Sequence, residues 1–208
     1  MPWKLINDIV KPWDELNALL VQRYAFQPDL SDVSNRIGTL SVSIKHQVDA
    51  LALEQPHKST KSWQETTDKE NTSARIISDL ADTVKHLTLR DARRQCSTAV
   101  IAQFECNDEE QFRFLRNAIM LTHASLGTHD FLAVALDAIQ FWIRKRRVQV
   151  NFDRKILEAP PEFFPTAHLT FDSRYCLLMS ETRIQFFRRD KNGVLIPHSP
   201  GNVTFVVH

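Results

Sequence analysis

The chain has 208 residues, of which 43% are hydrophobic and 25% are charged, values typical of a globular protein. This composition excludes a wholly disordered chain, a collagen-like repeat and a small disulfide-rich scaffold. The 26 Lys and Arg residues nearly balance the 25 Asp and Glu residues. The formal net charge of +1 therefore gives no overall basic field for binding nucleic acid or an anionic membrane.

The first residues carry no basic segment followed by an apolar core, and no stretch approaches the roughly 18 apolar residues of a membrane span. Three cysteines, Cys96, Cys106 and Cys176, occur without a CxxC pair. An odd number of unpaired cysteines indicates reduced thiols rather than a disulfide or zinc site. We therefore expect a cytoplasmic protein with no membrane contact.

Three amphipathic helices are predicted in the first part of the chain. Apolar residues recur at helical spacing over residues 3–24, which indicates a helix with one buried face. Beyond Pro28, Ser31 is a suitable N-cap for a second helix, which ends at Pro56. A third helix begins at Ser73. Together these segments predict an N-terminal helical bundle.

Residues 55–72 are almost entirely polar, with Trp63 as the lone large apolar side chain. A polar connection of this length is typical of a loop or linker. We predict a polar loop with a short helical stretch near residues 62–70, and a functional flap is the alternative.

A strand–turn–strand pattern follows the third helix. The β-branched and apolar run at residues 96–105 predicts a strand, and residues 107–110 are typical turn residues. Residues 111–123 fit a second strand, which would complete a central β-hairpin. The alternative is a helix with Phe112 and Ile119 on one face.

A long helix is predicted from Thr128 or His129 to about Val148. Nearly every residue between 131 and 143 is apolar, so we expect this helix to be buried at the centre of the core. It ends in the basic run 144–147, whose cations suit the negative end of the helix dipole.

The last third of the chain is rich in short β-type runs. The predicted strands cover residues 167–171, 175–180, 182–189, 194–196 and 203–207. The turn at Asp190–Gly193 favours a hairpin, and we predict a small antiparallel β region. The predicted fold class is therefore α+β. The predicted domains are a helical domain with an inserted hairpin at residues 1–148 and a β-rich extension packed on it at 149–208.

Residues 79–87, Asp-Leu-Ala-Asp-Thr-Val-Lys-His-Leu, resemble an Asp-Leu-Ala-Asn-x-x-Lys-His pattern of uncharacterised bacterial proteins. Those proteins place helices before a hairpin and close with a long helix containing a Trp, which Phe141-Trp142 would supply here. They are similar to the HEPN-type helical domains of toxin–antitoxin and phage-defence systems. The resemblance covers residues 30–147 and implies a bacterial or phage origin.

HEPN ribonucleases use an Arg and a His on one helix, with four to six residues between them. Arg116 and His123 have this spacing, and they would supply a cation near the scissile phosphate and a base near the 2′-hydroxyl. A strand at residues 111–123 would instead place the two side chains on opposite faces. The sequence leaves open whether the protein is an enzyme.

Two basic groups are candidates for binding a partner. On a helix continuing to Arg90, that residue and His86 would share a face. The basic helix end, together with two further basic clusters at Arg93-Arg94 and Arg188-Arg189, would create a local positive field. The alternative for both groups is a structural role. The candidate binding residues are Lys85, His86, Arg90, Arg144, Lys145, Arg146 and Arg147.

With only four glycines and no Walker, GxGxxG, HExxH or GxSxG motif, the sequence predicts no cofactor. No metal site is predicted either, because nothing adds further ligands to His123, His129 and Asp130. We predict a non-catalytic binding protein that acts through a protein or RNA partner. The alternative is a metal-independent endoribonuclease or toxin. Exposed strand edges in the last third would be compatible with a homo-oligomer.

Overall fold

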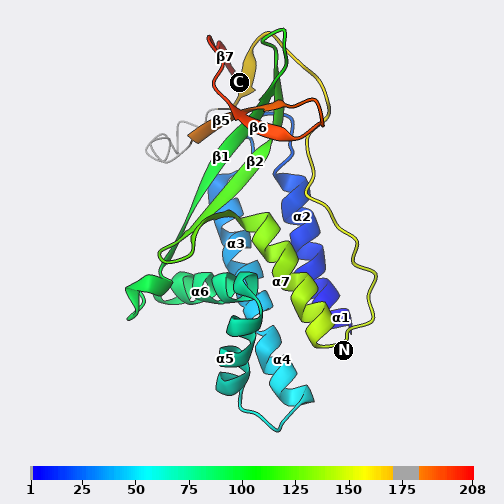
Figure 1. Ribbon diagram of the computed structural model, residues 1–208, viewed down its shortest axis with the longest axis vertical. Helices are drawn as coiled ribbons and strands as arrows, with labels where there is room; N and C mark the ends of the chain where they lie inside the picture. Colours follow the sequence, from blue (N-terminus) through cyan, green and yellow to red (C-terminus); the bar gives the residue numbers. More distant parts are fainter. Residues whose placement is uncertain (1, 171–182) are drawn as a thin grey trace. The chain divides into compact units, whose positions relative to one another are not determined.

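The computed structural model of the chain describes residues 2–170 and 183–208 (Figure 1). Its contacts divide the chain into two units. Unit 1 contains Met1–Leu16, Val33–Thr98 and Leu121–Ile156, and unit 2 contains Asn17–Asp32, Ala99–Met120 and Leu157–His208. Both units are discontinuous in sequence, so their limits are not those of the predicted domains 1–148 and 149–208.

The chain begins with continuous helical structure made of α1 (Pro2–Leu5), a π-helical turn (Ile6–Val10) and α2 (Lys11–Leu19). The helix predicted over residues 3–24 therefore ends earlier than expected. Its buried face includes Trp13, whose indole N–H donates to the carbonyl oxygen of Leu132 at 3.2 Å.

The second predicted helix is divided into α3 (Leu30–Lys45) and α4 (Gln47–Glu54), which are separated at His46. One face of α3 is buried, as the apolar spacing predicted, and includes Val33, Ile37 and Ile44.

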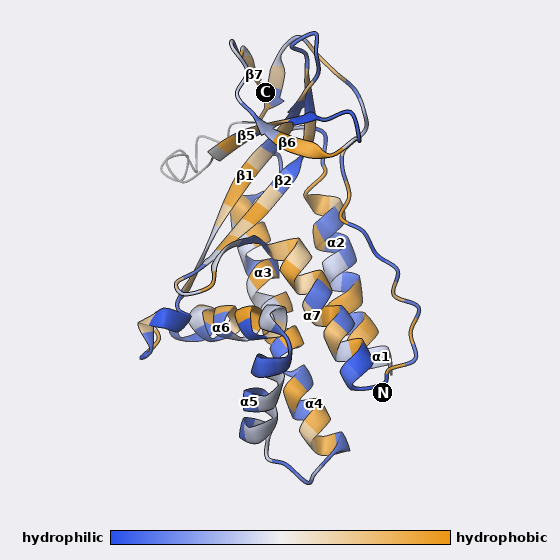
Figure 2. Cartoon of the chain, viewed as in Figure 1, coloured by the Kyte–Doolittle hydropathy of each residue, from blue (hydrophilic) through white to orange (hydrophobic). Residues whose placement is uncertain are grey.

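The helical stretch predicted near residues 62–70 is confirmed but is longer than expected, and the predicted polar loop at residues 55–72 is wrong, because most of it forms the helix α5 (Thr60–Glu70). The Ser59 hydroxyl caps this helix by accepting a hydrogen bond from the Ser62 N–H at 3.2 Å. The Trp63 side chain is buried, and its indole N–H donates to the Gln55 carbonyl at 3.2 Å. One cap and one aromatic anchor thus order a helix that is otherwise hydrophilic, as Figure 2 shows. In Figure 1, α5 lies beside α4.

Two further helices, α6 (Thr72–His86) and α7 (Phe131–Lys145), pack against each other in unit 1. The prediction that α7 is buried is confirmed. Its start was predicted two or three residues too early, because Gly127–Asp130 forms strand β3 and the Asp130 side chain caps the helix. The buried residues of α7 are Phe131, Leu132, Val134, Ala135, Ala138, Ile139, Phe141 and Trp142.

Strands β1 (Cys96–Cys106) and β2 (Phe112–His123) form the predicted central hairpin, preceded by a short 3-10 helix (Ala92–Arg94). They belong to a sheet of order β3-β2-β1-β5-β6. In this sheet β5 (Arg183–Arg189) runs parallel to β1, with Phe186 opposite Phe104, and β6 (Leu195–His198) is antiparallel to β5.

The β5–β6 hairpin was predicted correctly. Its turn contains Gly193 at a φ of +80°, and the Asp190 side chain accepts hydrogen bonds from the Asn192 and Val194 N–H groups. A second, two-stranded sheet pairs β4 (Ala167–Leu169) with β7 (Phe205–Val207) in parallel. The prediction of an antiparallel C-terminal region is therefore wrong for two pairings, because residue alternation assigns faces and does not assign partners.

The predicted strand at residues 175–180 lies outside the described residues, as does Cys176. The α+β class is confirmed. None of the helices in the described part of the chain has the length and apolar character that crossing a membrane requires.

Candidate functional site: an aromatic cavity

Unit 2 contains a cavity of about 470 Å³, a volume within the range of small-ligand sites, roughly 300 to 1,000 Å³. Its lining is rich in aromatic side chains and carries a few polar groups. The lining residues are Val21, Arg23, Tyr24, Phe104, Phe112, Phe114, Ala159, Pro160, Glu162, Phe164, Thr166 and His168.

Phenylalanines from the central hairpin form the floor of the cavity. Alternate residues of a strand face the same side of a sheet, so Phe112 and Phe114 of β2 share a face. The rings of Phe104 and Phe114 are 5.7 Å apart at an angle of 61°, and Phe186 of β5 lies 5.7 Å from Phe104. Rings in these orientations stabilise one another, so the floor is apolar and fixed in position.

The segment from Ala159 to Phe164 forms one wall. The Phe112 N–H donates to the Phe164 carbonyl at 2.7 Å, and the Phe164 N–H donates back at 2.9 Å. The Ala159 N–H donates to the Leu115 carbonyl at 2.7 Å. The Phe164 side chain is 42% exposed and therefore forms an accessible edge of the cavity.

A charge network centred on the buried Arg113–Glu105 pair holds the same wall. Arg113 lies 3.0 Å from the Glu105 carboxylate and 3.1 Å from that of Glu158, and it donates to the Ala159 carbonyl at 2.7 Å. Arg189 bridges the same two carboxylates at 3.1 and 2.7 Å. Arg189, which the sequence placed in a basic cluster, is thus compensated by two acids.

Asn117 positions the opposite wall, which follows α2. Its backbone N–H donates to the Leu20 carbonyl at 2.8 Å, and its side-chain oxygen accepts from the Phe26 N–H at 2.8 Å. Ala25 forms a bridge with Leu169. These contacts bring Val21–Tyr24 to the cavity.

Three stacked rings and a cation form the edge on this side. The Tyr24 ring stacks on His208, with centroids 4.2 Å apart and planes 8° apart. The His168 Nδ1 and His208 Nε2 atoms are 2.9 Å apart, and the Arg23 guanidinium lies over Tyr24 at 5.1 Å. Burial lowers the pKa of His168, and the charges of His208 and Arg23 lower it further. The cavity therefore combines aromatic walls with a cationic edge.

The predicted catalytic pair is not assembled on a helix. Arg116 and His123 both lie on β2, and their odd separation places them on opposite faces of the strand. The Arg116 Nε atom donates to Gln103 at 3.1 Å. His123 is buried, its Nε2 atom lies 3.0 Å from Asp79, and its Nδ1 atom accepts from the Ser125 N–H at 3.2 Å. The predicted strand at residues 111–123 is therefore confirmed, and the pair lacks the helical geometry that the HEPN resemblance implies.

The group at Lys85, His86 and Arg90 does not share a helix face. Helix α6 ends at His86, and Leu87 has a φ of +59° that turns the chain away from helical geometry. Arg90 lies beyond the helix. Lys85 and His86 are exposed at its last turn.

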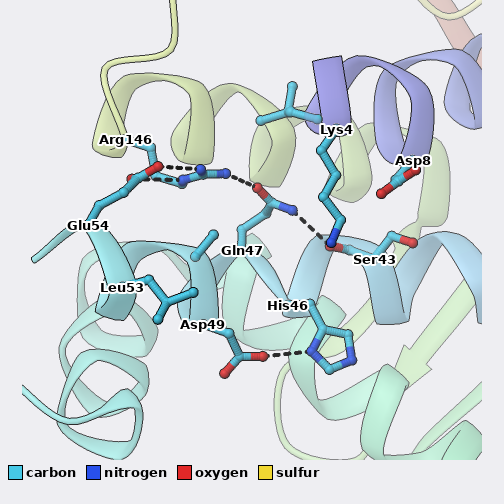
Figure 3. Close-up of a pocket in the computed structure, with 11 residues that line it drawn as sticks. Lys4, Asp8, Ser43, His46, Gln47, Asp49, Leu53, Glu54 and Arg146 are labelled. Atoms are coloured by element: carbon cyan, nitrogen blue, oxygen red, sulfur yellow. Dashed lines mark hydrogen bonds and ion pairs between the residues drawn. The ribbon is translucent and has the colours of Figure 1, made fainter. Parts of the chain in front are cut away.

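Two of the four cations in the basic helix end are compensated. Lys145 lies 2.5 Å from the Glu70 carboxylate. Arg146 forms a bidentate pair with Glu54 at 3.1 and 2.5 Å and also donates to the Gln47 side chain, beside a pocket of about 590 Å³ (Figure 3). The hydrogen bond from Arg146 lowers the pKa of Glu54. Arg144 and Arg147 are exposed, so these two cations, rather than the full run of four, are accessible to a partner.

The predicted basic pair Arg93-Arg94 is also compensated. Arg94 donates to Asp79 at 2.6 Å and to Asp82 at 2.9 Å, and Lys45 pairs with Asp82. Arg93 pairs with Asp91 at 3.0 Å. These ion pairs leave little of the positive field that the three basic clusters would create.

No group of three or more His, Cys, Asp or Glu side chains within residues 2–170 and 183–208 is arranged to hold a metal. The aromatic cavity was not predicted from the sequence. The alternation of Phe112 and Phe114 was the available signal for its floor, but nothing in the sequence shows that residues 159–168 cross that floor.

No family model, curated protein or solved structure matches this chain. Its function is therefore inferred from the geometry of the cavity and of the charged groups.

Proposed function

We propose that the protein is a non-catalytic binding protein whose aromatic cavity accepts one unstacked base of single-stranded RNA. The observation that carries this proposal is the cavity itself, where Tyr24, Phe112, Phe114 and Phe164 line a space of about 470 Å³. Sequence-specific RNA recognition commonly places an unstacked base against aromatic side chains. Any base can stack in this way, because every base has a π-face.

The polar groups at the edge of the cavity support the same ligand. Arg23 is exposed beside Tyr24, and a guanidinium can pair with the phosphate of the bound nucleotide. The Glu162 carboxylate is an acceptor for a base amino group. With a net charge of +1, stacking rather than a general positive field would supply most of the affinity, so binding would depend weakly on salt.

The surroundings of His123 support binding without cleavage. A general base must reach the 2′-hydroxyl to within hydrogen-bond distance. The His123 side chain is fully buried, and both ring nitrogens have partners within the protein. Arg116 projects from the other face of β2. Neither residue is placed for a metal-independent ribonuclease reaction.

The HEPN-like origin and the cytoplasmic location form part of this proposal. The order of α6, the β1–β2 hairpin and α7 with Trp142 supports the resemblance, because it is the order that the resemblance implies. The free, buried thiols of Cys96 and Cys106 support a reducing compartment.

Fluorescence anisotropy with a labelled eight-nucleotide oligouridylate tests the proposal. The informative variant is Phe164→Ala, which removes an aromatic ring at the accessible edge. The matched control is Phe205→Ala, because Phe205 also lies in unit 2, is 41% exposed against 42% for Phe164, and does not line the cavity.

A stacked base contributes about 1 to 3 kcal/mol, so Phe164→Ala should weaken binding roughly 5- to 150-fold. Phe205→Ala should leave the affinity unchanged. Absence of RNA binding by the wild type would overturn the proposal, as would equal affinities of the wild type and Phe164→Ala. Capture of a protein partner by an RNA-free preparation, undiminished by Phe164→Ala, would favour the protein-binding alternative.

A further inference from the structure

His208 lies outside the cavity, but three contacts connect it to the cavity wall. Its backbone N–H donates to the Leu169 carbonyl at 3.0 Å. Its ring stacks on Tyr24, and its Nε2 atom is 2.9 Å from the His168 Nδ1 atom. Tyr24 and His168 both line the cavity, whereas His208 does not.

These contacts are part of what holds two wall residues in position. The His168 Nε2 atom is 3.0 Å from the Thr166 hydroxyl, and the His168 ring is 5.1 Å from Phe164. The His208 ring covers one face of Tyr24 at 4.2 Å. If His208 were withdrawn, Tyr24 would lose the nearer of its two stacked rings and His168 would lose one of its two ring hydrogen bonds.

The hydrogen bond between the two imidazoles depends on protonation. It needs an N–H on one ring and a lone pair on the other. The pair persists when both rings are neutral or when one is protonated. When both are protonated, two N–H groups meet at 2.9 Å, and the bond is replaced by repulsion.

We infer that His208 is a positioning residue that fixes the Tyr24–His168 wall for base binding, and that double protonation of the His168–His208 pair releases this wall. The inference rests on the proposed function, since the ligand is the same base. The charged and titratable groups that face the pair are Arg23 and Tyr24 from the segment after α2 and Glu162 from the facing wall.

Independent evidence gives the direction of the pH effect. Burial, His208 and Arg23 all lower the pKa of His168 from its ordinary value of 6.5. Because the pKa of His168 is lowered, protonation of both rings requires acidic pH. The wall is held at neutral pH and is released on acidification.

The binding test uses adenosine, which has no phosphate, so that attraction between protonated histidines and a phosphate does not enter. Adenosine affinity is measured by NMR titration at pH 7.5 and pH 5.0. Loss of one aromatic contact costs about 1 kcal/mol, so the wild type should bind about fivefold more weakly at pH 5.0.

Two variants separate positioning from a general structural role. His208→Phe keeps a ring on Tyr24 but can neither titrate nor bond to His168, so its adenosine affinity should be the same at pH 7.5 and pH 5.0. His208→Ala should bind about fivefold more weakly at both values. A wild-type pH dependence that persists in His208→Phe would overturn the inference.

A ligand-free measurement separates this inference from the proposed function. Protection of the His208 amide against hydrogen exchange should fall about tenfold between pH 7.5 and pH 5.0, after correction for the intrinsic rate, because the β4–β7 end opens locally. If the protection falls in this way but neither adenosine nor oligouridylate binds at either pH, the proposed function is wrong and the pH-dependent release of the wall is still supported. If the protection of the His208 amide is unchanged, the pH-dependent release of the wall is wrong even if RNA binds.

Discussion

The Nε2 atom of His123 lies 3.0 Å from Oδ2 of Asp79, and the two side chains are 0% and 2% exposed. Arg94 binds the other oxygen of the same carboxylate at 2.6 Å. Asp79 therefore has a partner for each oxygen, which is the arrangement that a buried charge requires. The histidine that the sequence offered as a catalytic base is a structural element of unit 1.

His123→Ala should lower the free energy of unfolding by about 2 to 4 kcal/mol, because it leaves a cavity and removes a partner from a buried carboxylate. Urea denaturation followed by circular dichroism measures the change. The control is His86→Ala, at an exposed helix end, which should change stability by less than about 0.5 kcal/mol. An unchanged midpoint for His123→Ala would contradict the structural role.

Total RNA incubated with the wild-type protein in EDTA should remain intact, because His123 cannot reach a 2′-hydroxyl. The same should hold for His123→Ala and His86→Ala. RNA cleavage by the wild type that is lost in either variant would restore the endoribonuclease hypothesis. Gel electrophoresis of the RNA is a sufficient measurement.

Arg113→Met should destabilise the protein by about 3 kcal/mol, because it breaks a buried ion pair and leaves Glu105 with Arg189 as its remaining partner. Since Arg113 also binds the Ala159 and Pro160 carbonyls, oligouridylate affinity should fall with it. Replacing both members, Glu105→Leu with Arg113→Met, should recover most of the stability and not the affinity. A double variant as unstable as Arg113→Met would argue against an ion-pair cause.

Asp82→Asn should destabilise the protein at pH 7 by about 1 kcal/mol, and this effect should become smaller as the pH falls toward 3. Burial raises the pKa of Asp82, but hydrogen bonds and charges from Lys45 and Arg94 outweigh it, so the net pKa is lowered. A lowered pKa contributes stability above the unfolded value of about 3.9, and this stability is lost as the pH falls through the folded pKa. Urea midpoints between pH 3 and pH 7 measure the difference, with Asp8→Asn as the exposed control. A constant difference across this range would refute the linkage.

The Cys96 thiol should react very slowly with iodoacetamide in the folded protein at pH 8. Burial, aided by the charge of Asp79, raises its pKa to about 12, so only about one thiol in ten thousand is ionised. A Cys176→Ser background restricts the labelling to Cys96 and Cys106, and mass spectrometry counts the modified sites. The raised pKa of Cys96 also makes the stability of the fold depend on pH. Above about pH 8.5 the thiol ionises in the unfolded chain first, so stability falls as the pH rises. Rapid labelling of folded Cys96 would contradict its burial.

Features set by neighbours in the sequence could be predicted. The apolar run at Phe131–Ile143 indicated the buried helix α7, and the turn residues on either side of residues 111–123 favoured strand β2 over a helix. The extent of helix α5 was underestimated, because nearly all of its residues are polar. Its order depends on the Trp63–Gln55 hydrogen bond and the Ser59 cap, which composition does not reveal.

Features set by distant pairs could not be predicted in the same way. Alternation shows that Phe104 and Phe186 belong to strands, but it does not show that those strands are parallel neighbours. The site depends on such pairs throughout, since Phe112 meets Phe164 and Tyr24 meets His208. The positive field of the basic clusters was overestimated for a related reason. The acids that compensate Arg94, Arg146 and Arg189 come from other elements.

The parallel pairing of β1 with β5 also determines when unit 2 can complete its folding during translation. The hairpin strands leave the ribosome well before β5, because a long stretch of chain separates them. During that interval Phe104 and Phe112 lack Phe186 as a neighbour. Contacts between segments so remote form slowly and leave apolar surface open to aggregation. Nascent chains stalled before β5 should therefore bind chaperones, and full-length chains should lose that affinity once the last strands have been synthesised.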